Sequence, residues 1–167
     1  MDLPDNRYDY YTLTVDTVDQ TNKNTFSVYL TEPLKNVVQV KLLATHIHTA
    51  DTVQHLYIHI NELNSVFNDR ATIDLNSQGS ISRVRGSFAS VTVSSDHTSG
   101  TDQIINFKDK KDYEISNEYP SIIRRIDRLT VSLLDESGVL IPNPSVNTDE
   151  NVLILRFKCL SPSVILP

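Results

Sequence analysis

Four of the five histidines fall in two closely spaced pairs, a spacing that could hold a metal ion. His46 and His48 alternate along one predicted strand, and His55 and His59 share one face of the next, so antiparallel pairing could bring the pairs together. A cupin-type metal site would add a glutamate within about four residues of its His-x-His pair, whereas the first glutamate after His48 is Glu62. We therefore predict polar histidines at a solvent or subunit surface, with no metal and no other cofactor.

Catalytic motifs of other kinds have little support in the sequence. Asp96, His97 and Ser99 are neighbours along the chain, but a catalytic triad is defined by its geometry in space, so a solvated loop is the better interpretation. The chain has 4 glycines and none of them lies in a phosphate-binding pattern, so nucleotide-dependent chemistry is set aside. The sequence thus predicts a protein that is not an enzyme and has no catalytic residues.

The charge balance bears on the kind of partner. The formal net charge is -6 and the isoelectric point is near 5.2, so the average field repels phosphate backbones. Two local clusters of basic residues are exceptions to this acidic balance. The first consists of Arg83 and Arg85, and the second consists of Arg124, Arg125 and Arg128. Because aromatic residues are not interleaved with them, we expect ion pairs with an acidic neighbouring surface and no direct contact with nucleic acid.

The residue types that must build the surrounding elements favour strands. Valine, isoleucine and threonine together account for 45 of 167 residues, against 4 alanines. No apolar run approaches the roughly 20 residues that span a bilayer, and the first 25 residues lack a signal-peptide core, so no transmembrane segment is expected. The single cysteine, Cys159, cannot form an internal disulfide and is expected to be a small buried apolar residue.

Alternation of apolar and polar residues predicts about eight strands and no amphipathic helix. The segment 62–80 breaks the alternation and is expected to be a long loop or a short helix followed by a loop. Asp135 to Gly138 has turn chemistry and is expected to close a hairpin. The predicted strands are 11–15, 26–31, 36–49, 56–60, 81–95, 103–108, 129–133, 139–141 and 152–160.

Strands of this number, joined by some long connections, predict an all-β protein with an antiparallel two-sheet sandwich, a single jelly roll of about eight strands. We divide the chain into an N-terminal arm (1–10), the jelly-roll domain (11–160) and a C-terminal tail (161–167). The two ends are the segments in which we expect assembly contacts. The residues concerned are Asp2, Leu3, Pro4, Arg7 and Tyr8 in the arm and Val164, Ile165 and Leu166 in the tail.

Two parts of the chain resemble a known family. The first is Thr25 to Ile47, with the run Glu-Pro-Leu-Lys-Asn-Val-Val at 32–38 followed by Gln-Val-Lys-Leu-Leu. The second is Asp127 to Pro142 with the closing strand Asn151 to Lys158. These parts cover about half of the chain and are similar to the small single jelly-roll penton and minor capsid proteins of large double-stranded DNA viruses and virophages. Members often continue the first motif into a Pro-Asn pair, where this chain has His46 to Ala50.

The resemblance implies a structural capsid protein located in the virion and assembled in the host cell. It implies most characteristically the penton, a homopentamer around the icosahedral fivefold axis whose other partners are the major and minor capsid proteins of the same virion. A carbohydrate- or receptor-binding jelly roll, such as a fibre head or lectin, is the alternative from another class. That alternative would use loop residues such as Tyr113, Asn117 and Tyr119.

Overall fold

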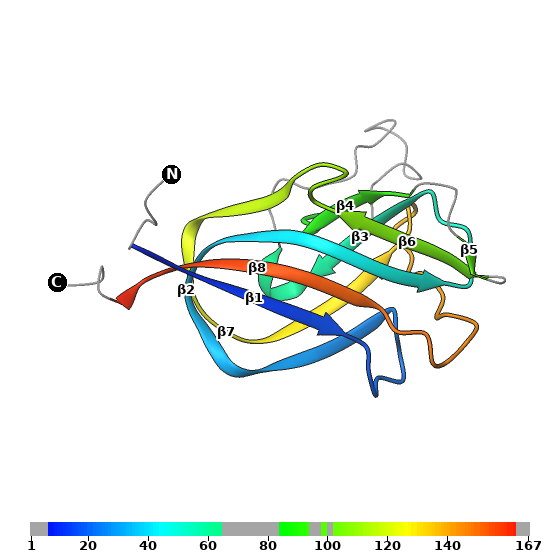
Figure 1. Cartoon of the computed structure of the whole chain (residues 1–167), viewed down its shortest axis with the longest axis horizontal. Helices are drawn as coiled ribbons and strands as arrows, with labels where there is room; N and C mark the ends of the chain where they lie inside the picture. Colours follow the sequence, from blue (N-terminus) through cyan, green and yellow to red (C-terminus); the bar gives the residue numbers. More distant parts are fainter. Residues whose placement is uncertain (1–6, 65–83, 94–97, 100–101, 163–167) are drawn as a thin grey trace, which may run out of the picture.

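The structure is a computed structural model that describes residues 7–64, 84–93, 98–99 and 102–162 (Figure 1). These residues form an all-β domain in which one short 3-10 turn, η1 (Asn61–Leu63), is the helical element of the described part. The strands are β1 (Tyr8–Asp16), β2 (Thr25–Thr49), β3 (His55–Ile60), β4 (Ala89–Thr92), β5 (Thr98–Ser99), β6 (Asp102–Lys108), β7 (Ile115–Leu134) and β8 (Val152–Leu160).

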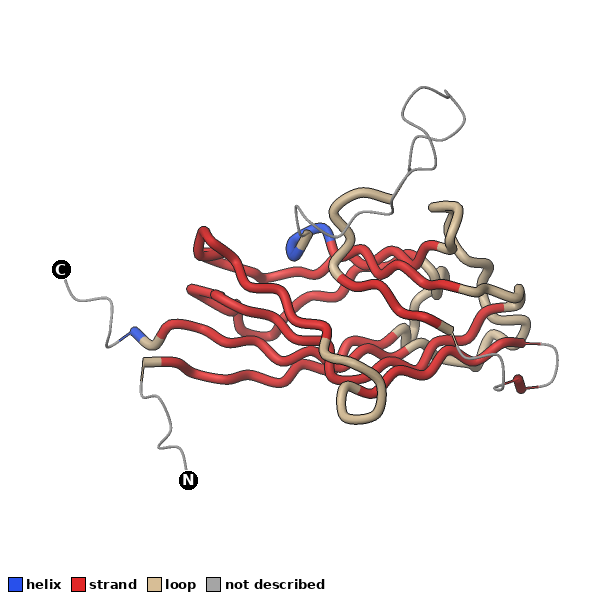
Figure 2. Tube along the Cα trace, turned by 90° about the horizontal axis from the view of Figure 1, so that it is seen from above, coloured by secondary structure: helices blue, strands red, loops and turns tan. Residues whose placement is uncertain are grey.

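The strands pair as two antiparallel sheets that share their two longest members. In the first sheet β1 pairs with β8, β8 with the second part of β2, and β2 with β6. In the second sheet the first part of β2 pairs with the end of β7, β7 with β3, and β3 with β4. Because β2 and β7 run through both sheets, the layers join along these strands (Figures 1 and 2). The pairing confirms the predicted antiparallel sandwich of the jelly-roll type.

The long strand β2 differs from the two strands that we predicted on either side of Pro33. The backbone stays extended from Thr25 to Thr49, and the interruption is a shift of register against β7 between Tyr29 and Leu34. Proline has no N–H to give to the ladder, so it is accommodated at such an irregularity without ending the strand. The break between the two predicted strands therefore coincides with this irregularity, but the strand does not end there.

Other strand boundaries also needed correction. β7 begins at Ile115, although no strand was predicted between residues 108 and 129. Within the predicted strand 81–95, β4 covers Ala89–Thr92, and residues 81–83 and 94–95 lie outside the described residues. After the turn at Asp135 a single bridge from Leu134 to Leu140 replaces the predicted second hairpin strand. Most of the segment 62–80 lies outside the described residues.

The core lies between the sheets and is built from the inward-facing residues of both. In β8 the buried positions alternate as predicted, with Leu153, Leu155, Phe157 and Cys159 at 3% exposure or less. The opposite face of β8 is half-buried or exposed. Burial, with the negative charge of Asp9 as a smaller cause, raises the pKa of the Cys159 thiol to about 11.

Candidate assembly surface

Two strand edges lie side by side without a partner strand in the described part of the domain. β1 is the outermost strand of the first sheet and pairs with β8 alone. The first part of β2 pairs with β7 on one side, and on its other side pairing with β8 begins only at Val37. Packed sheets are about 10 Å apart, roughly twice the spacing of paired strands, so an added chain at this opening would lie near both edges.

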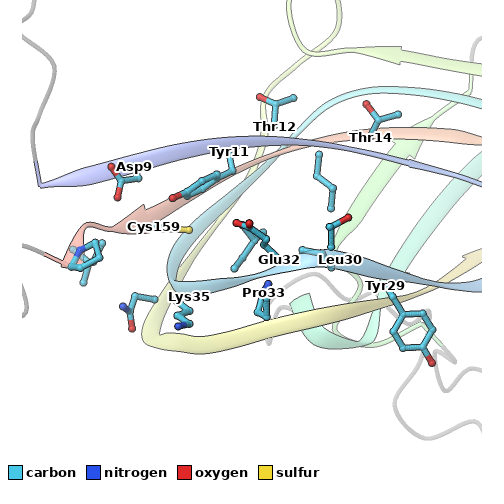
Figure 3. Close-up of a pocket in the computed structure, with 16 residues that line it drawn as sticks. Asp9, Tyr11, Thr12, Thr14, Tyr29, Leu30, Glu32, Pro33, Lys35 and Cys159 are labelled. Atoms are coloured by element: carbon cyan, nitrogen blue, oxygen red, sulfur yellow. The ribbon is translucent and has the colours of Figure 1, made fainter.

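A groove of about 630 Å³ runs between these edges (Figure 3). Its walls come from residues 9 and 11–14 of β1 and 29–36 of β2, and the end of β8 closes it at Cys159 and Leu160. Partly buried apolar side chains of Leu13, Leu30 and Leu34 pack against the core along its floor. The groove exists because the irregularity at Pro33 occurs where β2 passes from one sheet to the other, before β8 pairs with it.

The edge of β1 lacks the features that usually protect a free edge. Its sequence, Tyr-Asp-Tyr-Tyr-Thr-Leu-Thr-Val-Asp, contains no proline, glycine, lysine or arginine, and its nine-residue register with β8 is unbroken. Soluble proteins usually blunt such an edge with lysine, proline or a bulge, because unpaired backbone groups are a template for pairing with another chain. Tyr10 and Tyr11 are 57% and 48% exposed on the same strand. The edge therefore has the composition of a contact surface.

The rim of the groove is charged while its floor is apolar. Glu32 points from β2 toward β1, whereas Tyr29, which is 77% exposed, points away from β1 (Figure 3). Asp9 and Lys35 also belong to the lining. An apolar floor with a charged rim is the usual arrangement of a protein–protein contact. The alternation of apolar and polar residues placed Tyr11 in a strand. Tyr29, Glu32 and Lys35 were not predicted as contact residues.

The first and last described residues of the domain meet beside this groove, and two of the predicted assembly residues, Arg7 and Tyr8, are among them. The backbone N–H of Ser161 donates to the carbonyl of Arg7 at 2.9 Å. The Lys158 ammonium lies 4.0 Å from the centroid of the Tyr8 ring, and the Arg7 guanidinium carbon lies 5.8 Å from it. Tyr8 is the first residue of β1, so residues 8–10 of the arm that we defined belong to a strand.

The remaining predicted assembly residues lie outside the described residues. They are Asp2, Leu3, Pro4, Val164, Ile165 and Leu166.

The histidines are not brought into one group. His46 and His48 lie on β2 in the first sheet, with their Nε2 atoms 2.9 Å apart. His55 and His59 lie on β3 in the second sheet, where the His55 ring contacts the Ser90 hydroxyl and His59 Nε2 is buried without a hydrogen-bond partner. Burial lowers the pKa of both β3 histidines. Among the described residues no three His, Cys, Asp or Glu side chains gather around a metal position.

The second basic cluster lies on β7, where two of its arginines have acidic partners within the chain. Arg125 lies 3.4 Å from Asp127, and Arg128 lies 3.6 Å from Glu62. These pairs are largely exposed, so they contribute little to stability. Of the other predicted features, Arg83, Asp96 and His97 lie outside the described residues, as does the side chain of Ser99.

The three residues of the lectin alternative have their polar groups engaged inside the domain. The Tyr113 hydroxyl donates to the carbonyl of Ser90 at 2.8 Å, and the Asn117 amide donates to the carbonyl of Phe88 at 2.8 Å. The Tyr119 hydroxyl donates to a backbone carbonyl in η1 at 2.9 Å, and burial raises the pKa of this phenol far above its usual range. These side chains therefore hold neighbouring segments in place.

Comparison with known proteins identifies no family for this chain. No family model and no curated protein matches the chain. Among solved structures the chain is similar to the crystal structure of the infectious bursal disease virus VP2 subviral particle, with 10% sequence identity and a TM-score of 0.33. The match covers 93% of this chain and 34% of that one, so the chain spans about a third of its length. A likeness of this size carries no argument about fold or function. In the described part of the chain no helix is long and apolar enough to cross a membrane.

Proposed function

We propose that this chain is a structural protein of a viral capsid, and that it is the penton which closes the icosahedral fivefold vertices as a homopentamer. The observation that carries the proposal is the unprotected edge of β1 beside the free edge of β2. A domain with this surface gains stability when a neighbouring copy covers it. The major and minor capsid proteins of the same virion would surround the ring.

The family resemblance supports the proposal because its matched parts fall on the central strands of the fold. Thr25 to Ile47 covers almost all of β2, and Asn151 to Lys158 covers most of β8. Asp127 to Pro142 covers the end of β7 and the turn that follows it. These strands pair with one another across both sheets, so the resemblance concerns the framework that holds the two free edges in position.

A penton works through shape, since each wedge-shaped subunit must contact a copy of itself on both flanks. In a closed ring each contact joins two different surfaces of neighbouring subunits, so no subunit is left with an uncovered contact surface. The groove and the β1 edge supply one of these surfaces in our proposal. The net charge of -6 on each subunit opposes association, so ring formation should become stronger as salt screens this repulsion.

Hydrogen exchange of the β1 amides tests which surface is used. Exchange is followed at low and at high protein concentration, with mass spectrometry of peptides from β1 and from β3. We expect the β1 peptide to become more protected as the protein associates, while the β3 peptide stays unchanged. Association without added protection of β1 would show that another surface carries the contact.

A further inference from the structure

We propose that His46 and His48 form a binding site for one divalent transition-metal ion on the outer face of the first sheet. The two residues alternate on β2 with Ile47, which is buried in the core, so both imidazoles lie on the opposite face. Their Nε2 atoms are 2.9 Å apart, and the ring planes cross at 78° with centroids separated by 4.7 Å. The rings therefore meet at these two nitrogens and do not stack. This proposal revises the interpretation from sequence and is independent of the capsid function.

The atoms around the rings leave a bare Nε2 on His46 and place a carboxylate near Nδ1 of His48. Nδ1 of His46 lies 2.6 Å from Oδ1 of Asn106, and Nδ1 of His48 lies 3.6 Å from Oδ2 of Asp149. The Asn106 oxygen accepts from Nδ1 of His46, which leaves Nε2 of His46 with its lone pair, whereas the Asp149 carboxylate attracts a proton to Nδ1 of His48 without a hydrogen bond. A cation between the two Nε2 atoms requires the His48 proton on Nδ1, beside the Asp149 carboxylate, and it then takes the place of the hydrogen bond that the two rings can otherwise share.

The same outer contacts are those that metal-binding histidines usually make. A ligating imidazole generally donates its other N–H to a carboxylate or a carbonyl oxygen, which fixes the ring and makes it a better ligand. Asn106 fills this role for His46, and the Asp149 carboxylate lies 3.6 Å from Nδ1 of His48, where a small shift on metal binding would bring it within hydrogen-bond distance. His48 is also 8% exposed, and its Nδ1 is buried without a hydrogen bond, so its ring cannot easily turn toward water.

The position of Asp149 is fixed by the segment that leads into β8. β8 begins at Val152, opposite His46, so the residues before it pass beside His48. The side chain of Asn151, which is 2% exposed, accepts from the N–H of His48 at 2.8 Å and donates to the carbonyl of Lys23 at 2.8 Å. Lys23 in turn binds Glu150 at 2.8 Å. The two residues that follow Asp149 are therefore held by a largely buried network.

The separation of the nitrogens indicates which ions fit best. An ion about 2.05 Å from two nitrogens that are 2.9 Å apart sees them at roughly 90°. A tetrahedral ion with the same bond length would need nitrogens about 3.3 Å apart. Right-angled pairs belong to tetragonal or octahedral coordination, which is the preference of Cu²⁺ and Ni²⁺. The described residues supply two ligands, so water completes the coordination.

Titration of the untagged, full-length chain with NiCl₂ and CuSO₄ by isothermal calorimetry tests the proposal. We expect one ion per chain, with Cu²⁺ bound more tightly than Ni²⁺ and Ni²⁺ more tightly than Co²⁺. The His46→Gln variant, whose altered residue is exposed, should lose at least about tenfold in affinity, and Asp149→Asn should lose about tenfold. His55→Gln is the matched control and should bind as the wild type does. Electron paramagnetic resonance of the Cu²⁺ complex should show two imidazole nitrogens.

Two results would overturn the metal site. One is the absence of saturable binding, and the other is equal affinity in the wild type and His46→Gln. Either result would mean that the two rings share a hydrogen bond. In that case His46 donates from Nδ1 to Asn106, His48 donates from Nε2 to Nε2 of His46, and no ion is needed.

Discussion

Replacing Tyr11 by serine should weaken self-association while the domain stays folded. A tyrosine side chain contributes about 150–250 Å² of contact area, so its 48% exposed share is on the order of 100 Å². Covering this area in a contact between copies contributes about 2.5 kcal/mol at about 25 cal/mol per Å². The association constant of each contact should therefore fall roughly 60-fold in Tyr11→Ser.

Sedimentation velocity over a range of protein concentrations measures the effect, and urea unfolding checks that the monomer remains folded. Val139→Ser is the matched control, because Val139 is similarly exposed at 50% but lies in the turn after β7, outside the groove. The control should associate as the wild type does. Equal association constants for Tyr11→Ser and the wild type would refute the assignment of the β1 edge as a contact surface.

Four further outcomes are expected from the described interactions. Lys23→Met should lower the free energy of unfolding in urea by about 1.5–3 kcal/mol, since it removes charge-assisted bonds to Glu150. Phe157→Ala, at a fully buried position, should lower it by about 3–5 kcal/mol. Burial lowers the pKa of His59 from 6.5, so at acidic pH the native state binds fewer protons than the unfolded chain. The free energy of unfolding should therefore fall as the pH drops below 6.5, and His59→Gln should make this dependence on pH weaker. Because Cys159 is 3% exposed and its pKa is raised to about 11, iodoacetamide should label it slowly in the native protein and rapidly in urea.

Each of these outcomes can fail in a definite way. Unchanged urea midpoints for Lys23→Met or Phe157→Ala would contradict the burial or the bonds on which they rest. An identical pH profile for His59→Gln would mean that the ring titrates alike in both states. Rapid native labelling would mean that the thiol of Cys159 is accessible.

Period-two alternation was sufficient to predict strands that have one buried and one open face. β3 and β8 follow this pattern throughout, and their predicted and observed positions agree closely. The first part of β7 was missed because most of its residues, up to Arg125, are exposed or half-buried on both faces. In such a stretch apolar and polar residues do not alternate, so the sequence does not indicate a strand. Its extended geometry depends on pairing with β2.

The candidate contact surface could be predicted only in part, because it depends on which strands become edges. Tyr29 and Glu32 flank the register shift in β2, and nothing near them in sequence shows that β8 pairs with β2 only from Val37 onward. Likewise the alternation placed His46 and His48 on one face, but the position of Asp149 depends on a connection about 100 residues away in sequence. Long-range pairing decides both features.

The mass of the purified protein by native mass spectrometry, over a range of concentration and salt, tests the central claim most directly. The account predicts a species of five times the 18.9 kDa chain mass, which grows with concentration and with salt. A trimer, or a monomer that persists at every concentration and salt, would contradict the proposed homopentamer.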